Sequence, residues 1–262
     1  MKAPAFAKEL AKHTESFEEN FMILAELAFK VMADKRDDQH VAAIRSRVEI
    51  CWEIYTSVLI LTAEHLGVSS FGQCRNLFEN IVSTVYLAKH PELLQDFFDH
   101  GKLIAYESLR DMGLDQKKLD VVKAEYDAIK PRFMQGNRAL SWHKTTVKEL
   151  VETSGLAGMY PTFYKKASSV AHGDGFIGTG FKDGKWLYNV ADLPAGLYGD
   201  LALEFSYPIM VLLFEEIVPA VKFDADKELQ AALEVWKNIY KKFIEDKNNE
   251  AGQAVQSGGP TT

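Results

Sequence analysis

Apolar residues recur with the period of an α-helix along most of the chain, and this pattern predicts its elements. In residues 15–33 the apolar positions 17, 21, 24, 25, 28 and 31 fall on one face of a helix. Residues 38–66 become apolar on nearly every side, which is typical of a helix at the centre of a domain. Gly67 is expected to end this helix, and Ser69 or Ser70 to cap the next one, which runs to about residue 89.

The rest of the chain is also predicted to be mainly helical. Pro91 with Glu92 marks the start of one helix, and Pro131 is expected to bend or end a later, more polar one. Between residues 176 and 193, aromatic residues flank a Lys-Asp-Gly-Lys turn, which fits a small hairpin and an ordered loop equally well. The remaining expected elements are a helix at about 115–134, an irregular segment at 135–144, short helices at about 145–154 and 161–172, and long helices at about 196–221 and 225–247.

Together these elements predict an all-α fold. We expect a single bundle-like domain of about nine helices over residues 1–248, in which a small hairpin near residues 176–193 is one of the two alternatives for that segment. Residues 249–262 are small and polar, and they are expected to form a disordered tail.

Composition narrows the classes of function. The chain has 262 residues, 47% of them hydrophobic, and a formal net charge of −7, so no overall positive field attracts nucleic acid. Cys51 and Cys74 lie in apolar helical patterns and are interpreted as buried thiols of a reducing compartment rather than as a disulfide. The first residues lack the apolar core of a signal peptide, and the apolar segment 207–214 is too short to span a bilayer. We therefore expect a cytoplasmic protein that makes no use of a membrane.

The glycines in "SSVAHGDGFIGTG", residues 168–180, match the G-x-G-x-x-G spacing of a dinucleotide-binding loop. That loop needs a strand before it and a helix after it. Here the preceding segment has helical character and the following one has turn chemistry, so we predict that residues 173–181 bind no dinucleotide. Gly173 is instead expected at the C-terminal end of a helix, and no cofactor is predicted.

A histidine just before these glycines belongs to a polar series. Tyr160, Tyr164, Ser168 and His172 recur every four residues, so they share one face if their helix is continuous. His172 would lie in the last turn, where the helix dipole favours a protonated imidazole. A histidine that only caps a helix end explains this position as well.

A second polar group lies on the helix that ends near residue 89. Arg75 and Glu79 are one turn apart at the edge of an apolar stripe formed by positions 71, 74, 78, 81, 85 and 88. An exposed ion pair explains them, but a charge at the partly buried edge of a stripe needs a partner. We therefore predict that Arg75 and His172 come close in the fold, directly or through Ser168 or Glu79.

These residues resemble the pattern of a bacterial family of helical proteins of unknown function, over about residues 40–180. The resemblance implies an all-helical fold and a shared polar site, and it brings no established chemistry. The positions that carry it are Arg75, Glu79, Trp142, Tyr164 and the Ser-x-x-x-His-Gly run at Ser168, His172 and Gly173.

The chain is more distantly similar to the HEPN helical proteins, a superfamily that includes metal-independent ribonucleases of toxin and phage-defence systems. Their motif places an arginine and a histidine on one helix. This chain departs from that motif, because no histidine follows Arg75 within six residues. The similarity therefore implies a catalytic pair assembled from two helices.

Two hypotheses of function follow from these features. In the first, a polar pocket binds or cleaves nucleotide or RNA phosphates, as in stress or phage defence, and any enzyme would be a metal-independent hydrolase or ribonuclease. Its substrate-binding residues are Arg75, Tyr164 and Ser168, and its catalytic residues are Glu79 and His172, with His172 as general acid–base. In the second hypothesis the Arg/Glu/His network is structural, and the protein is a non-enzymatic interaction protein. The sequence leaves a homo-oligomer open.

Other chemistries have weaker support. Glu79, His143, His172 and Asp174 are residue types that bind metals, but no H-E-x-x-H or E-x-x-H run is present, so no metal is predicted. The nucleophile elbow G-x-S-x-G is also absent, so Ser-His-Asp catalysis is not predicted.

Overall fold

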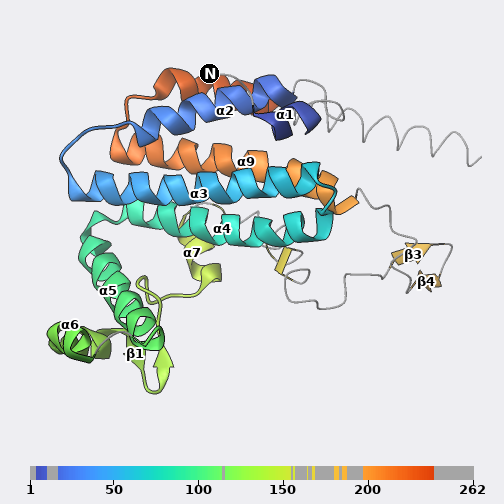
Figure 1. Cartoon of the computed structure of the whole chain (residues 1–262). Coiled ribbons are helices and arrows are strands. Elements are labelled where there is room, and N and C mark those ends of the chain that lie inside the picture. Colours follow the sequence, from blue (N-terminus) through green and yellow to red (C-terminus); the bar gives the residue numbers. More distant parts are fainter. Residues whose placement is uncertain are drawn as a thin grey trace, which may run out of the picture.

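The computed structural model describes residues 4–10, 17–113, 116–154, 156, 164, 167–168, 180–182, 185–187 and 197–238. Within these residues the protein is almost entirely helical, which confirms the all-α class (Figure 1). In chain order the elements are α1 (Ala5–Leu10), α2 (Phe17–Met32), α3 (Gln39–Ala63), α4 (Gly67–Lys89), the 3-10 turn η1 (Pro91–Leu93), α5 (Leu94–Asp111), α6 (Gln116–Ile129), the 3-10 turn η2 (Lys130–Phe133), β1 (Met134–Gln135), β2 (Arg138–Ala139), α7 (Val147–Thr153), β3 (Gly180–Lys182), β4 (Lys185–Leu187), α9 (Leu197–Val221) and a helix over residues 226–238.

Helices α3 and α4 lie side by side at the centre of the bundle, and α9 packs against both (Figure 1). Helix α3 also contacts α1 and α2, but it keeps an exposed polar face with Ser46, Glu49, Glu53 and Ser57, so the prediction that it is apolar on nearly every side is wrong. The predicted apolar stripe of α4 is buried along its whole length, from Phe71 to Ala88, and so are the predicted apolar positions of α2. Cys51 and Cys74 are buried free thiols within this core, as predicted.

The starts of two helices follow from local hydrogen bonds. The Asp38 carboxylate accepts from the backbone N–H groups of His40 and Val41, at 2.8 and 3.0 Å, and so caps α3. Thr146 and Glu149 cap α7 reciprocally, because each side chain accepts from the backbone N–H of the other residue. These contacts satisfy donors that the first turn of a helix leaves without a partner.

The prediction that Ser69 or Ser70 caps α4 is wrong. Helix α4 begins at Gly67, and the N-cap residue Leu66 makes no side-chain hydrogen bond. His65 turns the chain with a φ of 59°, so the connection is short and both serines already lie inside the first turn. Ser70 is buried instead, and its hydroxyl bonds back to α3.

Helix α5 leads away from the central helices, and α6 packs against it (Figure 1). As predicted, the polar helix ends near Pro131, where η2 follows α6. Ion pairs hold η2 and the segment that follows it against α5. Arg132 in η2 pairs with both Asp96 and Asp99, and Lys144 in the following segment pairs with Asp96. Arg132 Nη1 lies 2.6 Å from Asp99 Oδ2, and Lys144 Nζ lies 2.7 Å from Asp96 Oδ2.

Within the described residues the β-structure consists of two short hairpins. Strands β3 and β4 pair antiparallel, with Phe181 opposite Trp186, so of the two alternatives for residues 176–193 the hairpin is present. Strands β1 and β2 form a second, two-residue ladder inside the segment predicted to be irregular. The tail 249–262 and most of the helix predicted at 161–172 lie outside the described residues.

Candidate functional site

The polar residues predicted on α4 meet Tyr164. Arg75 Nε donates to Glu79 Oε1 at 3.0 Å, and the Tyr164 hydroxyl donates to the same oxygen at 2.7 Å. The Arg75 guanidinium also lies over the Tyr164 ring, 5.8 Å from its centroid, and this ring packs against Phe78. The Arg75–Glu79–Tyr164 cluster thus joins α4 to a segment 85 residues further along the chain.

The charges of this cluster largely cancel. Burial and the neighbouring Glu79 carboxylate raise the pKa of Tyr164 to about 12, so at neutral pH the phenol is protonated and donates. Burial by itself would lower the pKa of Arg75, but the Glu79 carboxylate outweighs burial and raises it. The side chains of Arg75 and Glu79 are 23% and 32% exposed, so the pair reaches solvent while its opposite charges compensate each other.

The structure therefore brings together three of the five residues predicted to form one site, Arg75, Glu79 and Tyr164. Ser168 is half-buried, and no hydrogen bond joins it to these three in the described part of the chain. His172, the predicted general acid–base, lies outside the described residues, as does Asp174. The expected approach of Arg75 and His172 stays a prediction.

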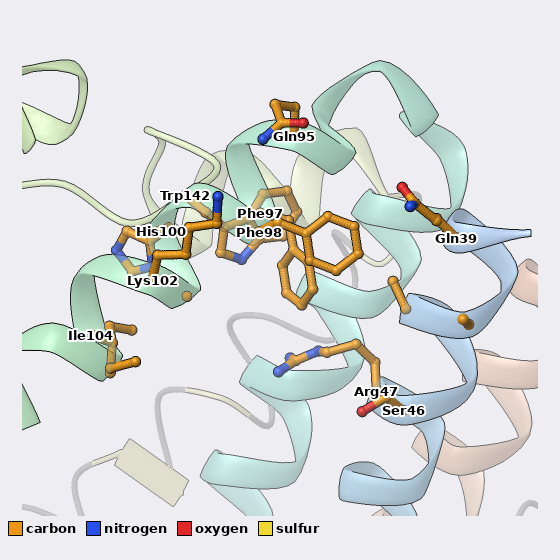
Figure 2. Close-up of a pocket in the computed structure, with 14 residues that line it drawn as sticks. Gln39, Ser46, Arg47, Gln95, Phe97, Phe98, His100, Lys102, Ile104 and Trp142 are labelled. Atoms are coloured by element: carbon orange, nitrogen blue, oxygen red, sulfur yellow. The ribbon is translucent and has the colours of Figure 1, made fainter. Parts of the chain in front are cut away.

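A pocket of about 960 Å³ lies between α3 and α5 (Figure 2). Its size is that of a small-molecule site. Small residues on the two facing helices, including Ala43, Ser46 and Gly101, leave the space open. The other lining residues are Gln39, Ala42, Arg47, Gln95, Phe97, Phe98, His100, Lys102, Ile104, Ala105 and Trp142.

Arg47 is the distinctive charge of this pocket. Its side chain extends from α3 into the space between the two helices (Figure 2). One guanidinium nitrogen, Nη2, donates to the Asn80 carbonyl oxygen at 3.3 Å, while Nε is buried without a hydrogen-bond partner among the described residues. Burial lowers the pKa of Arg47, although a guanidinium keeps its proton at neutral pH.

No carboxylate compensates this charge within the described part of the chain. The residues that line the pocket include no aspartate or glutamate, and Arg47 takes part in none of the ion pairs. Lys102, the other strong cation of the lining, is paired with Glu125 at 2.5 Å and with Asp99 at 3.6 Å. A half-buried cation without a carboxylate carries a desolvation cost that a bound anion relieves.

The segment that folds back onto α5 supplies the aromatic end of the pocket. Trp142 is buried and packs edge-to-face on Phe97, with ring centroids 5.5 Å apart and an interplanar angle of 88°. The ring of His100 holds the same segment, since its Nε2 lies 3.1 Å from the Leu140 carbonyl oxygen. Phe97 also contacts the ring of its neighbour Phe98.

Two histidines near Arg47 are neutral at physiological pH. Burial, with smaller contributions from His100 and Arg47, lowers the pKa of His143 to about 4. Burial is also the main reason why the pKa of His100 is lowered. His143 was considered as a metal ligand, but its Nδ1 lies 2.9 Å from the Ser141 hydroxyl. Among the described residues no three His, Cys, Asp or Glu side chains are grouped to hold a metal ion.

Sequence reasoning missed Arg47 and the pocket around it. The sequence signal was weak, because Arg47 is one of several charged residues in the first half of its helix, with Arg45, Glu49 and Glu53 close by. Such a charge is equally compatible with an outward-facing residue that reaches solvent. The position of α5, which closes the pocket, does not follow from the pattern of α3.

The fold and these two polar regions define an all-helical protein with a charge-compensated cluster on α4 and a cationic pocket beside α3. Residues 46–179 match the sequence profile of DUF5677, a family of unknown function, and the chain belongs to this family. The match confirms the first resemblance, whereas the similarity to HEPN proteins gains no support from it and stays a prediction. No curated protein and no solved structure matches the chain. None of the described helices is both long enough and apolar enough to cross a membrane.

Proposed function

We propose that the pocket between α3 and α5 binds a small anionic ligand that carries a phosphate group. The supporting observation is Arg47, a half-buried cation in the pocket without a carboxylate partner in the described part of the chain. A guanidinium suits a phosphate because its planar donors match two oxygens at once.

The expected size of this interaction can be estimated. A hydrogen bond to a charged group contributes about 1.5–3 kcal/mol, which corresponds to about 10- to 150-fold in affinity. Loss of the Arg47 guanidinium should therefore weaken binding by at least about tenfold. Because the removed charge has no carboxylate partner, its loss should leave the melting temperature unchanged or raise it.

The test is isothermal titration calorimetry of the full chain with inorganic pyrophosphate. Arg47→Met is compared with Arg45→Met, a matched control on the same helix. Arg45 also has a buried Nε without a partner among the described residues, but it does not line the pocket. We expect binding to be lost in Arg47→Met and retained in Arg45→Met. Equal binding by Arg47→Met and the unchanged protein, or equal loss in both variants, contradicts the proposal.

The cluster on α4 supports a second candidate function, hydrolysis of a phosphodiester. In the described part of the chain two donors orient the Glu79 carboxylate, both through Oε1. The side chain is one-third exposed, so it is positioned to take a proton from a substrate or water. In this candidate His172 is the partner acid, and nucleotide or RNA is the substrate.

Variants of the two predicted catalytic residues test this second candidate. Glu79→Gln and His172→Ala should abolish cleavage of single-stranded RNA, and His172→Ala should change the melting temperature little. If the network is structural, the same changes lower the melting temperature by about 2–4 °C for each kcal/mol of stability lost. Cleavage is then not the main role of Glu79 and His172.

A further inference from the structure

The α3–α5 pocket has an apolar wall as well as a cation. Phe98 is 37% exposed and Ile104 is 54% exposed, and both line the pocket. Figure 2 shows the Phe97 and Phe98 rings on the α5 side, across from the Arg47 side chain on α3. Apolar surface that stays accessible inside a concave site is the surface that an apolar part of a ligand covers.

Gly101 leaves additional room beside this wall. It lies in the interior of α5, where a glycine costs about 1 kcal/mol relative to alanine. Nothing in its surroundings demands a glycine, because a Cβ atom built there meets no atom within 4 Å. The missing side chain therefore enlarges the pocket next to Phe98 and Ile104 instead of relieving a close contact.

We infer that the ligand is a mononucleotide, with its phosphate on Arg47 and its flat base against the wall formed by Phe98, Gly101 and Ile104. This inference rests on the proposed phosphate binding and names the class of ligand. A phosphate alone would leave the apolar wall uncovered, whereas a base covers it by stacking on an aromatic ring.

A nucleic-acid strand fits the pocket less well than a single nucleotide does. A strand needs a track of cations for successive phosphates, and the chain has a net charge of −7. Two of the described residues that line the pocket carry a permanent positive charge, Arg47 and Lys102. Lys102 is already paired with acidic residues, so Arg47 is available for one phosphate group.

The inference is tested by calorimetry with four probes on the full chain: adenosine monophosphate, inorganic phosphate, adenosine and a short single-stranded RNA. We expect the monophosphate to bind at least tenfold more tightly than inorganic phosphate or adenosine, and the RNA to bind no more tightly than the monophosphate. Equal affinities for the monophosphate and inorganic phosphate overturn the inference and leave the proposed anion site intact. Absence of binding by every phosphate probe overturns both. Tighter, Arg47-dependent binding of RNA shows that a strand is the ligand and overturns the inference.

Two substitutions at Gly101 distinguish the effect of filling the pocket from the effect of stabilising the helix. Gly101→Leu places a branched side chain in the pocket, and it should weaken monophosphate binding at least tenfold while leaving inorganic phosphate binding within twofold. Gly101→Ala is the matched control, because it gains the same helix propensity but occupies little of the space. Both variants should melt at or above the temperature of the unchanged protein. Unchanged monophosphate binding by Gly101→Leu places the base elsewhere and contradicts the inference.

Discussion

Removal of one hydroxyl group tests whether the Arg75–Glu79–Tyr164 cluster stabilises the fold. Tyr164→Phe keeps the ring that packs on Phe78 and under the Arg75 guanidinium, and it removes the hydroxyl that donates to Glu79 Oε1 and also interacts with Arg75. A hydrogen bond to a charged acceptor contributes about 1.5–3 kcal/mol. The Glu79 side chain is 32% exposed and keeps its bond to Arg75, so water replaces part of the loss. We therefore expect a cost of about 1–1.5 kcal/mol.

The melting temperature and urea denaturation measure this cost. For a chain of this size, about 1–1.5 kcal/mol lowers the melting temperature by about 2–6 °C. The control is Tyr106→Phe. Tyr106 is also nearly buried and stacks on Tyr126 with ring centroids 4.2 Å apart, but its hydroxyl has no carboxylate partner in the described part of the chain. This control should change stability by less than about 0.5 kcal/mol.

A double-mutant cycle with Glu79→Gln isolates the bond itself. If the carboxylate is the relevant acceptor, Tyr164→Phe should cost clearly less in the Glu79→Gln background than in the unchanged protein. If Tyr164→Phe melts at the same temperature as the unchanged protein, or costs the same in both backgrounds, the structural reasoning about this cluster is wrong.

Three further predictions concern other parts of the molecule. The Tyr55 hydroxyl is fully buried without a partner among the described residues. Tyr55→Phe should therefore raise the free energy of unfolding by about 1 kcal/mol in urea denaturation, whereas a lower free energy of unfolding would show that the hydroxyl has an acceptor. The pKa of His143 is about 4 in the folded state against 6.5 for an ordinary histidine, so its neutral form supports stability fully above pH 6.5. That support is lost as the pH falls toward 4. His143→Gln should therefore flatten the dependence of the free energy of unfolding on pH in this range, and an unaltered dependence would contradict this prediction. Residues 173–181 should bind no NAD or FAD in calorimetry, and micromolar binding that Gly175→Val abolishes would overturn this prediction.

The sequence by itself determined most of the helices and the faces that they bury. The stripe on α4 and the apolar positions of α2 could be predicted because a helix of fixed period brings residues three and four apart onto one face. The same local geometry placed Arg75 and Glu79 in contact, and a proline ended the polar helix near residue 131. Local structure had two exceptions. Helix α3 ends at Ala63 and α4 already begins at Gly67, because the chain turns at His65, and β1 and β2 form a ladder in a segment predicted to be irregular.

Only the tertiary structure decided which distant residues meet. Tyr164 binds Glu79 across 85 residues, and no local period encodes that distance. The pocket depends on the direction in which α5 leaves the bundle and on the segment held against it by Arg132 and Lys144. Spacing along a chain fixes contacts within one helix, whereas contacts between helices depend on how all the buried faces pack at once. For this reason the sequence did not distinguish Arg47 from the other residues of α3. The position of α5 beside α3 in the structure identifies it as a candidate binding residue.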